Sequence, residues 1–323
     1  MDLNKFYKKI ESELSRGFNL KVKIRVRQLS TTTEFIVYSK EFSDTFLHII
    51  DTNELHLTDN DDSKFQMFIL DFIGRINKTL YLTFRDEIDK ITSCCDFYMS
   101  KCAKTFDIPE NVQGKNLSPG SLNQLGAQVF IYRIGSHYKS LKYLTEGCNL
   151  SKFLEIEYSI GILLRSCILD SVHIMAWGKD SKIISALASE SFLNNTDQLG
   201  KELKDEYLNY ANYFNVDKHD RPKDEIIWKK IMYKLQDATN TVKFANQYLE
   251  YSKYDHYSLI PFIYFKSTFQ KLYSIWQSMH FIKYAVCQLL SIHNIEFEKE
   301  FTEILGIYME DDGTGVFKFK NKM

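Results

Sequence analysis

Glycine and proline are scarce in this chain of 323 residues, which contains 13 and 4 of them respectively. Both residues interrupt regular structure, so their scarcity favours long uninterrupted helices. The six cysteines form no CxxC pair and follow no regular spacing. Their pattern excludes a zinc finger and a disulfide framework, and it indicates reduced thiols in a cytoplasmic protein.

A strong charge of either sign is also missing, because the formal net charge at pH 7 is −1. No global field would therefore recruit nucleic acid or an anionic membrane, and any RNA or phosphate site must be a local patch.

The opening MDLNKFYKKIESEL follows the pattern of an amphipathic helix rather than that of a signal peptide. Walker, dinucleotide-binding, HExxH and GxSxG motifs do not occur. We expect no metal and no cofactor.

What the chain does contain is a hydrophobic fraction of 44% and a charged fraction of 26%, as in a soluble globular protein. Near its start, residues 2–15 have apolar side chains at helical spacing, whereas residues 20–29 alternate apolar and basic side chains as in a half-buried strand. Residues 33–38 (TEFIVY) predict a partner strand, and residues 55–57 predict a third. We therefore predict a small α+β portion over 1–60.

Beyond residue 60 the helical period predominates. The expected helices are 61–76, 78–104, 121–147, 151–177, 180–193, 197–213, 223–250, 262–290 and 296–305. The fold class is thus mainly α, a helical bundle with a small N-terminal α+β portion and a C-terminal β-hairpin around Asp312-Gly313. Helix 151–177 would pack against 223–250 and 262–290 to form the core. The expected divisions are a helical connector (61–120), the bundle (121–306) and the hairpin (307–323).

The most informative segment is Tyr158–Trp177, because apolar residues occupy every side of its helical wheel. Such a helix is buried either in a bundle or in a membrane. It nevertheless contains Arg165, Asp170 and His173, which share one side of the helix at about 100° per residue. An ionised Arg or Asp costs about 2.5–3.5 kcal/mol at the centre of a bilayer. We therefore interpret this segment, and the apolar stretch 262–290, as buried helices of a bundle.

The charged residues of this helix have two interpretations. A desolvated Arg165 beside a carboxylate could bind phosphate or hold a catalytic histidine in position. In the other interpretation, Arg165 and Asp170 form a buried ion pair that locks two helices together and says little about activity.

A second candidate is the segment 251–258 (YSKYDHYS), a polar and aromatic break between two expected long helices. His256 is a candidate general acid–base, because an unperturbed imidazole titrates near neutral pH. The alternative is a connecting turn in which Asp255, Ser258 and the tyrosines cap the helix ends.

The residues Arg165, Ser166 and Asp170, with Ser252 and His256 further along, resemble an uncharacterised family of bacterial all-helical proteins. In that family an Arg-x4-acid helix is followed by a Ser/His turn, and the resemblance covers residues 125–295.

The chain also resembles the HEPN superfamily of helical bundles through Arg165-Ser166, the start of an Arg-polar-x-x-x-His motif. Many HEPN proteins are metal-independent RNases of toxin–antitoxin and phage-defence systems. The sequence departs from their motif at the histidine, because His173 lies beyond the usual window and Asp170 stands close to the expected place. His256 would have to supply the imidazole through space.

The resemblance implies an RNA-acting effector, a metal-independent endoribonuclease, in bacterial stress or phage defence. Arg165 would be the phosphate-binding cation, His256 the acid–base and Asp170 the orienting group. The other residues expected to contribute to binding are Ser166, His173, Ser252, Tyr254 and Tyr257. The resemblance also implies a cytoplasmic homodimer that acts on RNA, away from membranes, with an antitoxin or defence component as a protein partner.

The alternative function is a non-catalytic helical interaction module in which the Arg165–Asp170 pair is structural.

The sequence also contains weaker patterns. Arg133 and His137 stand four residues apart on an expected helix, and we expect both at the surface. The basic side chains over 21–27 could meet a phosphate backbone, but the solvated face of a strand explains them as well. The pair Asp170-x-x-His173 is half of a carboxylate-bridged metal site, and the second half is missing.

Overall fold

The structure is a computed structural model, and helices predominate in it, which confirms the mainly α fold class. The residues it describes are 3–39, 45–51, 62–102, 121–178, 182–194, 200–216, 248–249, 251–253, 266–292, 307–311 and 317–321. The chain forms two compact units. The first comprises Met1–Arg85, Gly147–Glu157 and Ser258–Gln277, and the second comprises Asp86–Glu146, Tyr158–Tyr257 and Ser278–Met323. The divisions expected from the sequence remain predictions.

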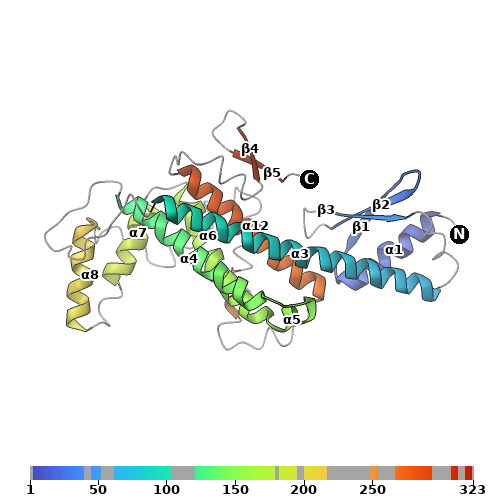
Figure 1. Cartoon of the computed structure of the whole chain (residues 1–323), viewed down its shortest axis with the longest axis horizontal. Coiled ribbons are helices and arrows are strands. Elements are labelled where there is room, and N and C mark those ends of the chain that lie inside the picture. The colour runs from blue at the N-terminus through green and yellow to red at the C-terminus, as the bar shows by residue number, and fades with distance from the viewer. Residues whose placement is uncertain are drawn as a thin grey trace. The chain divides into compact units, whose positions relative to one another are not determined.

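The first unit opens with helix α1 and an antiparallel sheet of order β1-β2-β3 (Figure 1). The bounds are α1 Leu3–Phe18, β1 Val22–Gln28, β2 Thr32–Ser39 and β3 Thr45–Asp51. Ile24 pairs with Val37, and Val37 pairs with Phe46. The first two predicted strands are confirmed. The predicted strand at 55–57 lies outside the described residues, and the sequence reasoning missed β3.

An aromatic side chain of the sheet joins two helices of this unit. Phe35 of β2 is fully buried and makes edge-on contacts with Tyr7 of α1 and with Phe72 of helix α3 (Asp62–Cys102), at centroid distances of 6.4 and 5.9 Å. The apolar face of α1, with Ile10 and Leu14 fully buried, lies against the same core. The alternation in β2 therefore buries one face, as period-two patterning requires.

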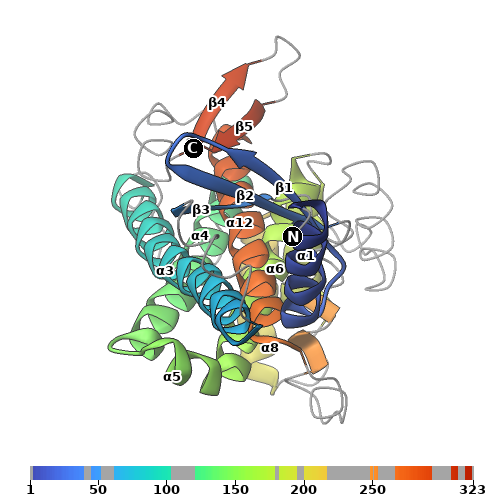
Figure 2. The same cartoon turned by 90° about the vertical axis from the view of Figure 1, so that its right-hand side faces the viewer.

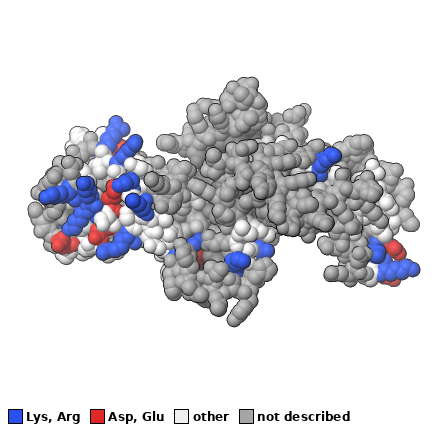
Figure 3. All heavy atoms as spheres, turned by 180° about the vertical axis from the view of Figure 1, so that it is seen from behind, with Lys and Arg blue, Asp and Glu red and all other residues white. Residues whose placement is uncertain are grey.

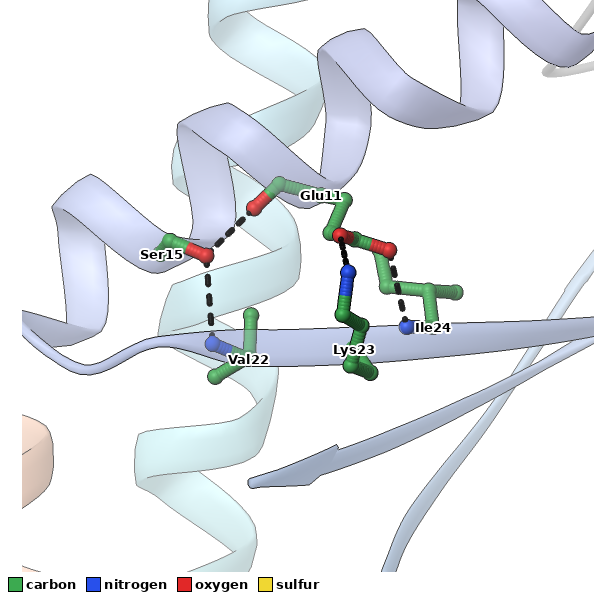
Figure 4. A network of polar contacts seen from close by, with 5 residues as sticks. All are labelled: Glu11, Ser15, Val22, Lys23 and Ile24. Carbon is green, nitrogen blue, oxygen red and sulfur yellow. Dashed lines mark hydrogen bonds and ion pairs between the residues drawn. The ribbon is translucent and has the colours of Figure 1, made fainter. Parts of the chain in front are cut away.

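Polar contacts hold α1 to β1 (Figure 4). The Ser15 hydroxyl donates to the Glu11 carbonyl at 2.7 Å and accepts from the Val22 N–H at 3.2 Å. The Glu11 carboxylate accepts from Lys23 Nζ at 2.8 Å and from the Ile24 N–H at 3.4 Å. Two side chains of one helix thus satisfy two backbone donors at the edge of the sheet.

Helix α3 runs unbroken over Asp62–Cys102, so the prediction of two helices, 61–76 and 78–104, was wrong. The segment contains no proline, and buried apolar side chains continue at every fourth position through the expected break. They are Phe72, Ile76, Leu80, Phe84 and Ile88. This continuous helical period explains why the chain does not turn there.

Helix α4 (Ser121–Thr145) is followed by Gly147 at φ 68°, the left-handed conformation that glycine adopts past a helix end. This confirms the predicted helix 121–147. The predicted helix 151–177 is instead two helices, α5 (Leu150–Glu155) and α6 (Glu157–Trp177), with a break at Ile156. Asn149 caps α5 by accepting from the Lys152 N–H at 3.0 Å.

Helix α6 alone, within the described part of the chain, is long and apolar enough to cross a membrane by length and composition. Its apolar window is 61% buried in the folded chain. The first residue of α6, Glu157, is buried and pairs with Lys271 at 2.5 Å.

The remaining helices in the described part of the chain are short except for α12 (Thr268–Ile292), which is labelled in Figure 2. They are α7 Ile183–Ser189, the π-helical turn η1 Glu190–Asn194, α8 Lys201–Tyr213 and α12 Thr268–Ile292. The predicted helices 180–193 and 197–213 are confirmed in outline. Of the predicted helix 223–250, only 248–249 is described, and it is helical. The predicted helix 296–305 lies outside the described residues.

Helix α12 begins later than the predicted 262 because Ser267 and Gln270 form a reciprocal cap. The Gln270 N–H donates to the Ser267 hydroxyl at 3.2 Å, and the Ser267 N–H donates to the Gln270 side chain at 2.9 Å.

Strands β4 (Ile307–Asp311) and β5 (Phe317–Asn321) pair antiparallel, which confirms the predicted C-terminal strand pair.

Candidate functional site

Arg165 lies on α6 in the second unit and is partly exposed. Its guanidinium carbon lies 5.4 Å from the centre of the Tyr248 ring, within the range of a cation–π interaction. Tyr248 and Leu249 are helical, and so are residues 251–253. The structure therefore brings Arg165 beside Tyr248, which precedes His256 by eight residues in the sequence.

Only some of the other residues predicted to contribute to this site belong to the described part of the chain. Ser252 is buried, and its hydroxyl donates to the Leu249 carbonyl at 2.6 Å. Ser166 is partly exposed on α6 next to Arg165. Tyr254, His256 and Tyr257 lie outside the described residues.

Asp170 has a different partner from the one expected. Its Oδ2 atom lies 3.1 Å from Nε of Arg133 on α4, in an ion pair whose aspartate side chain is 2% exposed and whose arginine side chain is 50% exposed. No well-aligned hydrogen bond reaches Oδ2 in the described part of the chain. Arg165 precedes Asp170 by five residues, about 140° around a helix, so the two side chains point to different neighbours.

Burial raises the pKa of Asp170 to about 7, and the positive charge of Arg133 opposes that rise. The carboxyl group is therefore poised to gain or lose a proton near neutral pH, as functional carboxyls often are. The pKa values of carboxyl groups in structural ion pairs are shifted too. The geometry around Asp170 must therefore show whether its carboxyl group is functional or structural.

His173, one turn after Asp170, lies beside the Phe130 ring at a centroid distance of 6.3 Å. Burial, together with the smaller effect of the Arg133 charge, lowers the pKa of His173 to about 4. The imidazole is consequently neutral at neutral pH. His173 shares its surroundings with Asp170 and Arg133, and the structure does not bring Arg165 into that group.

A cavity of about 210 Å³ lies where α4, α6, α7 and η1 meet, all within the second unit. Arg133, Asp170 and His173 line it together with Ser191, and the rest of its wall is predominantly apolar. A Cβ atom at Gly126 would come within 2.9 Å of the Ile184 side chain, so glycine permits the close approach of α4 and α7.

Arg133 is the residue of this cavity whose role the sequence reasoning missed, because it was expected with His137 at the surface. Arg133 is half exposed, but its Nε faces the buried carboxylate of another helix. His137 is partly buried, and desolvation followed by the Arg133 charge lowers its pKa. The available signal was a single aspartate in the apolar helix α6 and a single arginine in α4.

The basic strand face has intramolecular partners. Lys and Arg side chains gather with acidic ones over the unit that carries α1 and the sheet (Figure 3). Lys23 pairs with Glu11, Arg27 lies 3.9 Å from Glu34, and the Arg25 guanidinium lies over the Tyr38 ring. These exposed pairs favour a solvated surface over a phosphate-binding one.

The described residues also include potential metal ligands and thiols. Among the described residues, no three His, Cys, Asp or Glu side chains are grouped so as to hold a metal ion. No disulfide joins the five cysteines with described side chains, and burial raises the pKa of Cys95 to about 12, so this thiol is not an activated nucleophile.

No protein-family model, no curated protein and no solved structure matches this chain.

Proposed function

We propose that the chain is a HEPN-like RNA-acting effector whose site forms between α6 and the segment from Tyr248 to His256. The contact of Arg165 with Tyr248 is the observation that supports this proposal most strongly. Tyr248 precedes His256, the proposed acid–base, by eight residues in the sequence, which supports a site shared by this histidine and Arg165, the proposed phosphate-binding cation. Ser166 neighbours this arginine, and Tyr254 and Tyr257 would offer rings for stacking on bases.

The proposed reaction is metal-independent cleavage of RNA. The ribose 2′ oxygen forms a bond to phosphorus while the bond to the 5′ oxygen breaks, which leaves a 2′,3′-cyclic phosphate and a 5′-hydroxyl. His256 takes the proton of the 2′-hydroxyl, and Arg165 stabilises the negative charge on the non-bridging oxygens of the crowded phosphorane. In a homodimer, the imidazolium of the second copy returns a proton to the leaving oxygen.

The roles of Asp170 and His173 differ from those implied by the resemblance. Asp170 pairs with Arg133, and His173 lines the same cavity, so the proposed RNA site consists of Arg165, the Ser/His segment and Ser166. The cytoplasmic location, the homodimer and an antitoxin or defence protein as partner remain part of the proposal on the strength of the resemblance.

Expression in bacteria tests the proposal. We expect the native chain to arrest growth and to fragment cellular RNA, and Arg165→Ala and His256→Ala to relieve both effects. Arg85→Ala is the matched control, because Arg85 is an exposed helical arginine in the other unit. Unimpaired growth and intact RNA with well-expressed native protein would contradict the proposal.

A non-catalytic helical interaction module is the second candidate, and an exposed apolar pair on α3 favours it. Met67 and Leu70 are 70% and 68% exposed and lie one turn apart. Large exposed apolar side chains in one place are common at protein interfaces. In the expression experiment, this function predicts harmless native protein and no difference between the native chain and Arg165→Ala.

A further inference from the structure

The cavity between α4, α6, α7 and η1 is large enough for a small organic molecule. Its volume is about 210 Å³. An apolar cavity of about 150 Å³ is enough to bind benzene. Most of the wall is aliphatic or aromatic, with Leu125, Val129, Phe130, Leu169, Ile184 and Leu187 among the lining residues. A ligand of one ring or similar size would therefore find an apolar body of matching dimensions.

The polar side chains in the cavity wall define the kind of group that a ligand must present. Oδ2 of Asp170 is buried without a well-aligned hydrogen-bond donor among the described residues. An unsatisfied buried acceptor is costly, so a ligand that donates a hydrogen bond to it recovers that cost. Arg133 lines the cavity and its side chain is 50% exposed, so its guanidinium is accessible from the surface, whereas the Asp170 side chain beside it is 2% exposed.

The charges around the cavity favour a neutral ligand. A cationic ligand would meet the guanidinium of Arg133, and an anionic one would meet the carboxylate of Asp170. His173 adds no charge at neutral pH, because burial keeps its pKa near 4. A hydroxyl group suits both charged partners, since it donates to a carboxylate and accepts from a guanidinium.

We propose that this cavity is a binding site for a small neutral molecule with a single ring and a hydroxyl group. The ring would lie among Leu125, Phe130 and Leu187, and the hydroxyl would donate to Asp170 Oδ2 and accept from Arg133. This site is separate from the proposed RNA site, and ligand binding to it does not depend on RNA cleavage.

Binding of phenol to the full chain tests the proposal, with toluene and benzoate as matched probes. Toluene has the same shape without the hydroxyl group, and benzoate has an anionic head. One hydrogen bond corresponds to about a tenfold difference in affinity, so we expect phenol to bind about tenfold more tightly than toluene. Benzoate should bind more weakly than phenol. Saturation-transfer NMR and isothermal titration measure the three affinities.

Two variants and one direct observation locate the site. Asp170→Leu removes the acceptor and should abolish the preference for phenol over toluene, while Ala188→Phe fills the cavity and should abolish binding of both. In the native chain, which needs no substitution, phenol should show intermolecular NOEs to the methyl groups of Leu125 and Leu187. No phenol binding up to about 10 mM, equal affinity for phenol and toluene, or NOEs to other residues would overturn the proposal.

Discussion

Two buried ion pairs of the second unit have the same chemistry and different surroundings. Lys283 of α12 lies 3.0 Å from Oε2 of Glu87 on α3 and donates to Oε1 at 3.1 Å, and both side chains are 5–6% exposed. Asp170 of α6 meets Arg133 of α4 through one atom at 3.1 Å, and the arginine is half exposed. The first pair is enclosed by helices, whereas the second lines a cavity.

The difference shows which buried charge is structural. A carboxylate held by a fully buried cation satisfies the requirement for pairing inside a core, and such pairs say little about activity. A carboxylate that lines an apolar cavity and is paired with a half-exposed arginine can instead interact with another molecule that enters the cavity. Stability should therefore depend strongly on Glu87–Lys283 and weakly on Arg133–Asp170.

The largest expected effect is that of Lys283→Met, which keeps the apolar stem and removes the charge. Glu87 would remain buried without its main partner, so we expect a loss of about 3 kcal/mol in the free energy of unfolding, measured in urea. The double variant Glu87→Leu/Lys283→Met should recover most of this loss, because it leaves no buried charge unpaired. A change in Lys283→Met within about 0.5 kcal/mol would show that the pair is not structural.

The pH dependence of stability separates Asp170 from His173. The pKa of Asp170 is raised to about 7 by burial, so its contribution to stability is present at low pH and declines as pH rises from 4 to 7. The pKa of His173 is lowered to about 4, so stability declines as pH falls from 6.5 to 4. In the native chain the two trends oppose each other.

Single variants should expose each trend. Relative to the native profile, His173→Gln should lose stability with rising pH and Asp170→Asn should gain it, each with a slope of up to about 1.4 kcal/mol per pH unit. Urea unfolding at several pH values from 4.5 to 6.5 measures both. Parallel profiles for the two variants would mean that neither group titrates as its surroundings indicate.

A smaller effect is expected for Asp170→Asn at pH 7. The amide has the same shape, and the carboxyl group is partly protonated at this pH because of its raised pKa. The half-exposed Arg133 can be hydrated when its partner loses charge. We expect a change within about 1 kcal/mol in either direction. A loss as large as that of Lys283→Met would assign this pair a structural role too.

The smallest effect should come from an exposed ion pair, which serves as a reference for both buried ones. Glu11 and Lys23 join α1 to β1 at 2.8 Å, and Glu11→Gln keeps an acceptor for the Ile24 N–H. Because solvent and salt screen this pair, we expect no resolvable change in the urea midpoint, at low salt or at about 1 M salt. A midpoint shift that approaches that of Lys283→Met would contradict the contrast between exposed and buried pairs.

Local patterns predicted much of the fold. The alternation over 20–29 and 33–38 gave two strands, Gly147 marked a helix end, and Asp312-Gly313 indicated the C-terminal strand pair. The errors arose where one local signal competed with another. The apolar run from 262 concealed the cap formed by Ser267 and Gln270, which sets the start of α12.

The candidate sites depend on long-range pairing, which a single sequence does not contain. The apolar helix made Asp170 conspicuous, but its partner Arg133 is 37 residues away on another helix, and only the packing of α4 against α6 joins them. Arg165 was recognised for its charge, whereas its contact with the Tyr248 ring required the tertiary fold. The cavity has no local sequence signal, because helices from separate parts of the chain enclose it.

Cleavage of a labelled RNA by the purified protein in EDTA tests the central claim most directly, that Arg165 and the segment after Tyr248 form an RNA-cleaving site. The native chain should cleave and leave 2′,3′-cyclic phosphate ends, and Arg165→Ala and His256→Ala should each be at least about 100-fold slower. Asp170→Asn should cleave at the native rate, because its carboxyl group belongs to the cavity. Intact RNA with native protein, or equal rates for native protein and Arg165→Ala, would contradict the account.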